Sequence, residues 1–361
     1  MSLPLRVHGS AISYFTGKLE GYLRYKEIPY ERVAMTPLVR AKVRRRTGTA
    51  QMPAVELPDG RWMTDTTPMI EWFEAQHPEP AVIPIDPVQG FFSRLVEDYA
   101  DEWLWRPALH YRWSYRGDAL LLSRRIVDEM MPRVPLPGAW KRFLIRERQR
   151  RRYVRGDAID AGTRAHVESV YLRTLDRLEA IFGRRPFLLG ERPTLADFGF
   201  FASMFRHFSL DPTPCALMLE RAPAVYEWTA RTWNARSSTP CGALLEGIPA
   251  DWSPILHDAG ATYLPYLCAN AEAWGRRERR FDLGIEGVVY RRLPTSRYRV
   301  WCLERLQRHL EALPAQARDE AERLLESNGC KEPLWRVARP ESGYDVAHAA
   351  PFAPGLGVFE R

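Results

Sequence analysis

Cysteine is scarce in this chain, and the first 214 of its 361 residues contain none. The five cysteines are odd in number and no two of them have the CxxC spacing, so the sequence predicts neither a disulfide framework nor a zinc or other metal site. A redox mechanism that depends on a cysteine in the N-terminal half is excluded as well. These residues are Cys215, Cys241, Cys268, Cys302 and Cys330.

Long apolar runs are also missing. No stretch approaches the roughly 20 apolar residues that cross a bilayer, and the first ten residues lack the basic-then-apolar pattern of a secretory signal. The composition, 45% hydrophobic and 27% charged, is that of a soluble globular protein. We therefore expect a cytoplasmic protein without a membrane partner, and 361 residues predict more than one domain.

The basic residues gather in two runs, within a net charge of +7. They lie between Arg40 and Arg46 and between Lys141 and Arg155. Such runs bind anions or nucleic acid in some proteins and form solvated helix faces in others. The second run includes the acidic Glu147 and has no recognition motif beside it, so the pattern favours a solvated face over nucleic-acid binding.

The first 80 or so residues alternate between strand and helix patterns. A strand, a helix, a strand, a helix, two strands and a helix in this length are typical of a compact α/β domain. A turn of hairpin type at Pro58-Asp59-Gly60 separates the last two strands. The strands are expected at residues 5–8, 30–33, 54–57 and 61–63, and two of the helices at 16–26 and 65–77.

The rest of the chain changes character twice. A proline-containing stretch precedes about 150 residues of helical pattern, in which Thr194 and Asp197 form a capping box. From about Pro249 the sequence pattern changes again, and we expect a strand at 281–290 and an amphipathic helix at 298–313. The predicted organisation is an α/β domain at 1–83, a linker at 84–90, an all-helical domain at 91–247 and an α+β extension of unknown role at 248–361.

Four motifs, each weak alone, follow one another in the order and at the spacing of one family. They are the run from Ser13 to Leu19 that continues to Ile28-Pro29-Tyr30, the segment Met52-Pro53-Ala54-Val55, the pair Asp65-Thr66, and Pro186 to Gly190 with the capping box after it. Over residues 5 to about 246 the chain resembles the glutathione S-transferases, in a serine-type and bacterial style. The resemblance implies a thioredoxin-like N-terminal domain, the helical C-terminal domain of that family, and a homodimer.

The resemblance also implies where glutathione would bind. It predicts a cis bond before Pro53, which would leave the backbone of Met52 to pair with the extended tripeptide; the alternative is a trans proline that begins an edge strand. Asp65 and Thr66 would hold the γ-glutamyl end at a helix N-terminus, or serve only as a helix cap. Arg40 and Lys42 are candidates for the glycyl carboxylate, or else solvated charges.

The chemistry of the family needs the thiol of glutathione as a thiolate. Lowering a thiol pKa of about 8.5 by two units takes roughly 2.7 kcal/mol, and one hydrogen bond to a charged group contributes roughly 1.5–3 kcal/mol. Ser13 aligns with the catalytic position and is the first candidate donor. Tyr14, where the family often has Pro, is the second, followed by Ser10 and Thr16. With no cysteine here, transfer through a mixed disulfide is not expected.

The second substrate would lie between the two domains. Trp105, Tyr111 and Trp113 are candidates to line its pocket, with core packing as the alternative. The predicted function is conjugation of glutathione with an apolar electrophile, the chemistry of detoxification. Two alternatives stay open: a glutathione-dependent lyase, etherase or isomerase, and a non-catalytic adaptor on the same fold, like the metaxin-related proteins.

Overall fold

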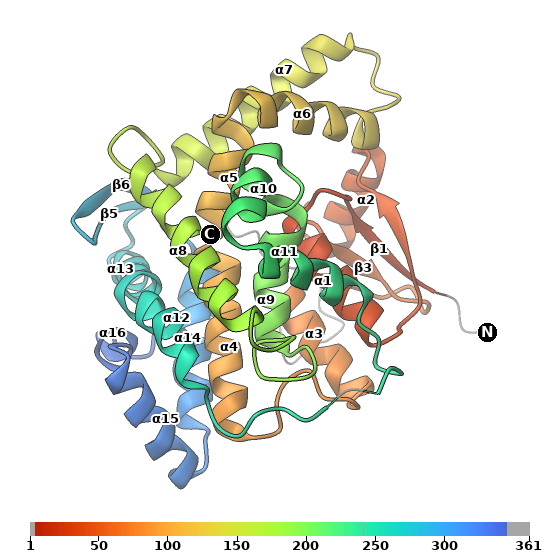
Figure 1. Ribbon diagram of the computed structural model, residues 1–361. Coiled ribbons are helices and arrows are strands. Elements are labelled where there is room, and N and C mark those ends of the chain that lie inside the picture. The colour runs from red at the N-terminus through yellow and green to blue at the C-terminus, as the bar shows by residue number, and fades with distance from the viewer. Residues whose placement is uncertain (1–3, 241, 345–361) are drawn as a thin grey trace.

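The computed structural model describes residues 4–240 and 242–344. Its first unit contains a mixed sheet of four strands, which lies at the N-terminal end of the chain in Figure 1. The strands are β1 (Leu5–Gly9), β2 (Tyr30–Ala34), β3 (Ala54–Glu56) and β4 (Trp62–Thr64). They lie in the order β2-β1-β3-β4, and β1 is parallel to β2 but antiparallel to β3. All four predicted strands are present.

Three helices cover the two faces of this sheet: α1 (Tyr14–Tyr25), α2 (Pro37–Thr47) and α3 (Thr66–Gln76). Side chains that alternate along a strand point to opposite faces. Val55 and Met63 accordingly belong to the large core that includes α1 and α3, whereas Ala54 and Trp62 form a smaller cluster with α2. The arrangement is the predicted thioredoxin-like domain.

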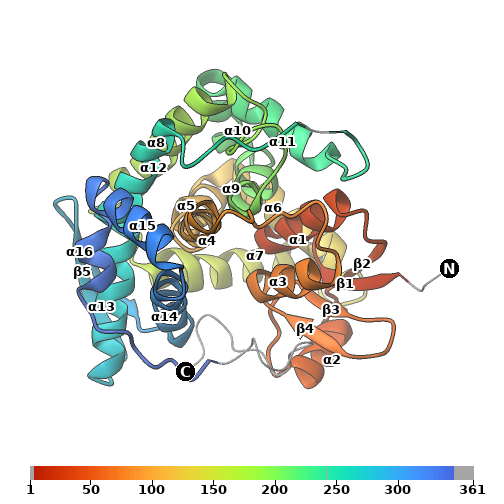
Figure 2. The same cartoon turned by 90° about the horizontal axis from the view of Figure 1, so that it is seen from below.

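The second unit is all helical, and α4 (Pro87–Glu102) runs through its middle (Figure 2). All but two residues of α4 are buried, so other elements surround it. The other helices are α5 (Trp105–Ser114), α6 (Arg116–Met130), α7 (Gly138–Gln149), α8 (Arg164–Phe182), α9 (Leu195–Ser203), α10 (Pro212–Arg221) and α11 (Pro223–Asn234), with the short π-helices η1 (Arg150–Val154) and η3 (Met204–Phe208) and the 3-10 helix η2 (Arg155–Asp157).

Two predictions about this unit have different outcomes. The capping box of Thr194 and Asp197 is present at the start of α9. The linker expected at 84–90 is too long, because α4 already begins at Pro87. Asp86 caps that helix by accepting the backbone N–H of Gln89 at 2.8 Å, and a capping Asp followed by Pro is itself a helix-start signal.

The C-terminal extension packs on the side of α4 away from β1 (Figure 2). It contains α12 (Ser253–Asp258), α13 (Leu264–Gly275), β5 (Arg280–Ile285), β6 (Val288–Pro294), α14 (Arg297–Glu311), α15 (Ala315–Ser327) and α16 (Lys331–Trp335), with η4 (Ala250–Trp252) and η5 (Ala259–Tyr263).

In this extension, the strand expected at 281–290 is instead a hairpin. Glu286 and Gly287 turn the chain with φ values of 46° and 77°, and Gly is the residue that adopts such values readily. The helix expected at 298–313 is α14, which contacts α4 together with α15. The extension is therefore part of the same packed body as the helical unit.

Two absences concern only the residues that the structure describes. None of their helices combines the length and the apolar character that a membrane crossing requires. The four cysteines among them, Cys215, Cys268, Cys302 and Cys330, are free thiols; Cys241 lies outside the described residues.

Candidate functional site

The register of the sheet brings three loops to one end. His8 of β1 lies beside Ala54 of β3, and Ala54 lies beside Thr64 of β4. The segments that follow β1 and β4 and the segment that precedes β3 therefore lie next to one another at the same edge of the sheet. These segments are the turn from β1 to α1, the Met52-Pro53 peptide before β3 and Asp65 after β4, and they hold four of the predicted site residues: Ser13, Met52, Pro53 and Asp65.

Ser13 stands at the N-cap of α1 with extended backbone angles, φ −86° and ψ 132°. Its Oγ accepts the backbone N–H of Thr16 at 3.4 Å. The hydroxyl proton is not used in that bond, and among the described residues no acceptor takes it. Ser13 is partly exposed. It can therefore cap the helix and still donate a hydrogen bond to a ligand.

The other three candidate hydroxyls are committed elsewhere or enclosed. Tyr14 is 1% exposed and donates to the carbonyl of Ala100 at 2.6 Å, and burial raises the pKa of its phenol well above the usual value. Ser10 donates to Glu129 at 2.6 Å. Thr16 is fully buried. Of the four residues, only Ser13 is partly exposed and keeps a hydroxyl proton that no described residue accepts.

Glu129, near the end of α6, is a residue that the sequence analysis missed. Its carboxylate accepts the Ser10 hydroxyl and, at 2.9 Å, the backbone N–H of Ala11. It thus places a negative charge beside the turn that leads into α1. No local pattern could reveal this contact, because it joins residues more than 100 positions apart and depends on how α6 packs.

The Met52–Pro53 peptide bond is cis, which confirms the prediction. Met52 is partly exposed, and its backbone N–H and C=O form no hydrogen bond with any other described residue. Backbone groups of this kind pair readily with an extended peptide. The position beside β3 thus suits the strand-like pairing that the resemblance implies.

Asp65 begins α3 with φ 76°, and its carboxylate accepts the backbone N–H of Thr67 at 3.3 Å. Burial of the carboxyl group raises the pKa of Asp65 to about 7, although Lys18, the Thr67 N–H and Arg305 each lower it in part. Part of the residue surface stays exposed. The neighbouring Thr66 is 3% exposed.

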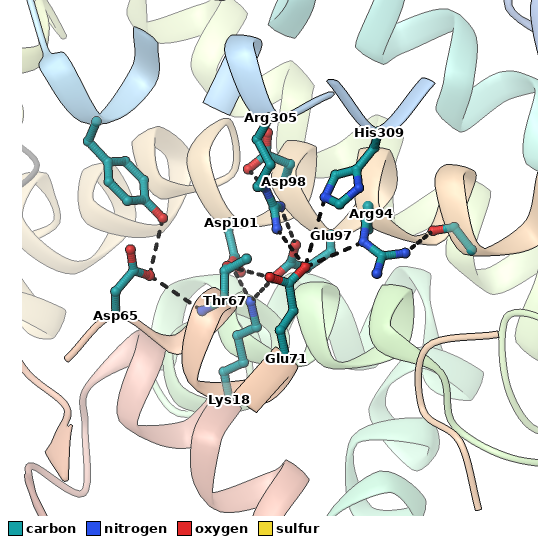
Figure 3. Close-up of polar contacts among 12 residues, drawn as sticks. Lys18, Asp65, Thr67, Glu71, Arg94, Glu97, Asp98, Asp101, Arg305 and His309 are labelled. Atoms are coloured by element: carbon teal, nitrogen blue, oxygen red, sulfur yellow. Dashed lines mark hydrogen bonds and ion pairs between the residues drawn. The ribbon is translucent and has the colours of Figure 1, made fainter. Parts of the chain in front are cut away.

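A network of buried charged side chains lies beside Asp65 (Figure 3). Lys18 of α1 donates to Glu97 at 2.5 Å and also to Asp101, both on α4. Burial alone would raise the pKa of Glu97, but Lys18 and Arg305 outweigh it and hold that pKa at about 2. Asp101 and Glu97 likewise raise the pKa of Lys18 despite its burial. The network joins the first domain to the second.

Helix α3 contributes to this network through Thr67, a residue that the sequence analysis also passed over. Its hydroxyl donates to Glu97 at 2.7 Å. The pair Asp65-Thr66 matches the family motif, whereas Thr67 belongs to no motif. Its role follows only from the packing of α3 against α4.

Arg40 and Lys42, both on α2, do not lie together at this edge. Lys42 donates to both carboxylate oxygens of Glu56, at 3.0 and 3.1 Å, and sits over the ring of Trp62. Arg40 is largely exposed, and the partial burial of its guanidinium, together with the nearby Arg148, lowers its pKa. Lys42 therefore forms its ion pair within its own domain, because the carboxylate of Glu56 in β3 lies within hydrogen-bond distance of its ammonium group.

The three aromatic candidates for the second pocket differ in their exposure to solvent. Tyr111 and Trp113 are 2% and 1% exposed and belong to the core, so they line no open surface. Trp105 is partly exposed and stacks on Phe15, with ring centroids 5.8 Å apart. It is therefore the one of the three that lies beside the start of α1 and can touch a ligand.

Two family models match the chain. One describes the N-terminal domain of glutathione S-transferases and covers residues 7–81. The other describes their C-terminal domain and covers residues 160–231. A comparison with curated proteins gives no match.

Several solved structures are similar at low identity. A glutathione S-transferase from Methylobacterium radiotolerans, in complex with glutathione sulfonate, is 19% identical over 67% of this chain and 100% of its own, with a TM-score of 0.39. A beta-etherase from Sphingobium sp. strain SYK-6 is 20% identical over 63% and 94%, with a TM-score of 0.46. A glutathione S-transferase from Rhodospirillum rubrum F11 is 19% identical over 69% and 97%, with a TM-score of 0.42.

The assignment rests on the two domain models, which occur in the order of the family and contain the motifs described above. The described fold agrees with them, with a thioredoxin-like sheet followed by a helical unit. The chain thus contains the N-terminal and C-terminal domains of the glutathione S-transferase family, matched over residues 7–81 and 160–231, and carries an additional C-terminal extension.

Proposed function

We propose that this protein binds glutathione at the edge of its first domain and uses it against an apolar electrophile. The observation that carries the proposal is the meeting of three groups at that edge. They are the free hydroxyl proton of Ser13, the unpaired backbone of Met52 and the carboxylate of Asp65. These match the chemical needs of a thiol, an extended peptide and an α-ammonium.

Each group has a defined task in this proposal. Met52 pairs with the tripeptide backbone and sets its direction. The carboxylate of Asp65 accepts hydrogen bonds from the α-ammonium group. The backbone N–H groups at the N-terminus of α3 and the hydroxyl of Thr66 donate to the neighbouring carboxylate. Ser13 then donates its hydroxyl hydrogen bond to the sulfur at the N-terminus of α1. Both the bond and the helix end favour the thiolate over the thiol.

The attack on the second substrate follows from that thiolate. Its electron pair forms the bond from sulfur to the electrophilic carbon, and the leaving group departs with the electrons of the broken bond. Trp105 beside Phe15 offers an apolar surface next to the start of α1. Lyase, etherase and isomerase reactions would use the same glutathione site with a different second substrate, and a non-catalytic adaptor would bind glutathione without turnover.

A calorimetric titration with reduced glutathione tests the proposal. Wild-type protein should bind, and Thr66→Ala should weaken binding by about tenfold, because a hydrogen bond to a charged group is lost. Thr174→Ala is the matched control, since that hydroxyl bonds the carbonyl of Val170 in the middle of α8. No heat of binding at millimolar glutathione would refute the proposal.

The family resemblance further implies a homodimer and a cytoplasmic location, and we retain both as predictions. Helix α4 is buried within a single chain, so a second copy would have to contact a different face. Light scattering on purified protein measures the mass in solution. A mass near 84 kDa, about twice the 41.8 kDa chain, would support the homodimer.

A further inference from the structure

The C-terminal extension reaches across the helical unit to Asp65. The hydroxyl of Tyr298 in α14 donates to one carboxylate oxygen of Asp65 at 3.3 Å. The hydroxyl of Tyr344, in the segment after α16, donates to the other oxygen at 3.3 Å. The two tyrosine residues are 8% and 5% exposed. Both oxygens of the carboxylate that we assign to the α-ammonium thus have a donor from the extension.

Aromatic packing fixes the two tyrosines relative to each other. Their ring centroids lie 5.8 Å apart, and Trp301 of α14 lies 5.3 Å from each of them. Such aromatic clusters stabilise the arrangement beyond the area they bury. Tyr298 and Tyr344 therefore form one unit against Asp65.

Polar contacts hold the segment of Tyr344 to α14. Ser342 donates its hydroxyl and its backbone N–H to Glu304, at 2.5 and 3.0 Å. Arg297 donates to the carbonyl of Ser342 at 2.6 Å and to that of Gly343. These contacts keep the Tyr344 hydroxyl at the carboxylate.

Besides burial, which raises the pKa of Asp65, groups from four helices act on its charge. Lys18 of α1, Arg305 of α14 and the Thr67 N–H of α3 favour the ionised carboxylate, whereas Glu102 of α4 disfavours it. Arg305 belongs to the extension and also contacts Glu97 at 3.2 Å. The extension thus supplies a positive charge as well as two hydroxyl donors.

We infer that the C-terminal extension completes the glutathione site, with Tyr298 and Tyr344 as positioning residues that orient Asp65 and keep it ionised for the α-ammonium of the ligand. The inference rests on the proposed function. A donor bonded to a carboxylate stabilises its charged form. Only the charged form pairs with an ammonium, so the tyrosines act on affinity through the ionisation of Asp65.

This mechanism has a signature in the pH dependence of binding. Loss of both hydroxyls raises the pKa of Asp65, so a larger share of the carboxyl is protonated in acid. Glutathione affinity of Tyr298→Phe/Tyr344→Phe should fall by about tenfold near pH 6, which corresponds to a shift of one pKa unit. Near pH 8.5, where Asp65 is ionised in both proteins, the affinities should agree within about twofold.

The experiment is a set of calorimetric titrations with reduced glutathione from about pH 5.5 to about pH 8.5. Tyr263→Phe is the matched control, because this tyrosine also belongs to the extension and donates to a buried carboxylate, that of Asp98, at 2.9 Å. The control should follow the wild-type affinity at every pH. If the double variant does not fold, Tyr344→Phe alone should show the same trend with a smaller shift.

The possible results separate the two proposals. If wild-type protein does not bind, the proposed function fails. If wild-type protein binds and the double variant weakens equally at all pH values, or not at all, the tyrosines are structural and the inference fails. Tighter binding by the variant would mean that the extension obstructs the pocket, which also overturns it.

Discussion

The two ends of the proposed glutathione site are built in different ways. At the thiol end, Ser13 is partly exposed and owes its geometry to the helix that it caps. At the γ-glutamyl end, the carboxyl group of Asp65 is enclosed and depends on α1, α4 and the extension. A neutral hydroxyl at the surface needs only local geometry, whereas a buried carboxylate needs compensating charges and donors from several elements.

The first prediction concerns the buried charge network beside Asp65, at the γ-glutamyl end, and has the largest expected effect. Lys18→Met would leave Glu97 and Asp101 without their shared cation in the interior. Removing one partner of a buried ion pair costs about 3–5 kcal/mol. Urea denaturation measures the change in the free energy of unfolding.

Arg221→Met is the control for that measurement. Arg221 pairs with Asp176, and both side chains are about half exposed, at 47% and 48%. Exposed pairs contribute at most about 1 kcal/mol. Equal losses in the two variants would contradict the distinction between a buried network and a surface pair.

The second prediction tests how Asp65 affects glutathione affinity and the stability of the fold. Asp65→Asn removes the charge for the α-ammonium and should weaken glutathione binding by about 100-fold, the upper range for a hydrogen bond to a charged group. Calorimetry gives this ratio. Unchanged affinity would show that the ammonium does not bind there.

The same variant should alter the pH dependence of stability. In the folded protein the pKa of Asp65 is raised to about 7, above the value of about 3.9 for an unfolded chain. The carboxyl therefore contributes stability below about pH 4 that is lost as the pH rises to about 7. Relative to Asp65→Asn, wild-type protein should lose stability across this window, as urea titrations at several pH values would show.

The third prediction concerns the thiol end and is the most local. Ser13→Ala should lower the conjugation rate by about 10- to 100-fold, because one hydrogen bond to the thiolate is lost. Glutathione affinity should change only a few-fold. The ultraviolet absorbance of the thiolate, followed against pH, measures the thiol pKa directly and should shift upwards.

Tyr14→Phe serves as the control at this end. Its hydroxyl bonds the carbonyl of Ala100 in the interior, so the variant should lose some stability and keep the thiol pKa. If Tyr14→Phe shifts the thiol pKa and Ser13→Ala does not, the catalytic assignment is reversed.

Much of the fold could be predicted from local patterns. The four strands, the capping box of α9 and the amphipathic α14 each have a signal within a few residues, because propensity and burial on one face act over that range. The predicted linker is too long because Asp86 caps α4 and the helix begins at Pro87. The alternating pattern predicts one strand where β5 and β6 form a hairpin, because the turn at Glu286-Gly287 interrupts the alternation only briefly.

The sequence by itself determined the first domain, the cis bond before Pro53 and the position of Ser13 at a helix start, since each depends on neighbouring residues and on a family pattern of fixed spacing. Only the tertiary structure decided that Glu129 lies at the thiol end, that Tyr111 and Trp113 are core residues, and that Tyr298 and Tyr344 contact Asp65. These contacts join residues far apart in the chain. No local pattern encodes them, because they arise when the helical unit and the extension pack around α4.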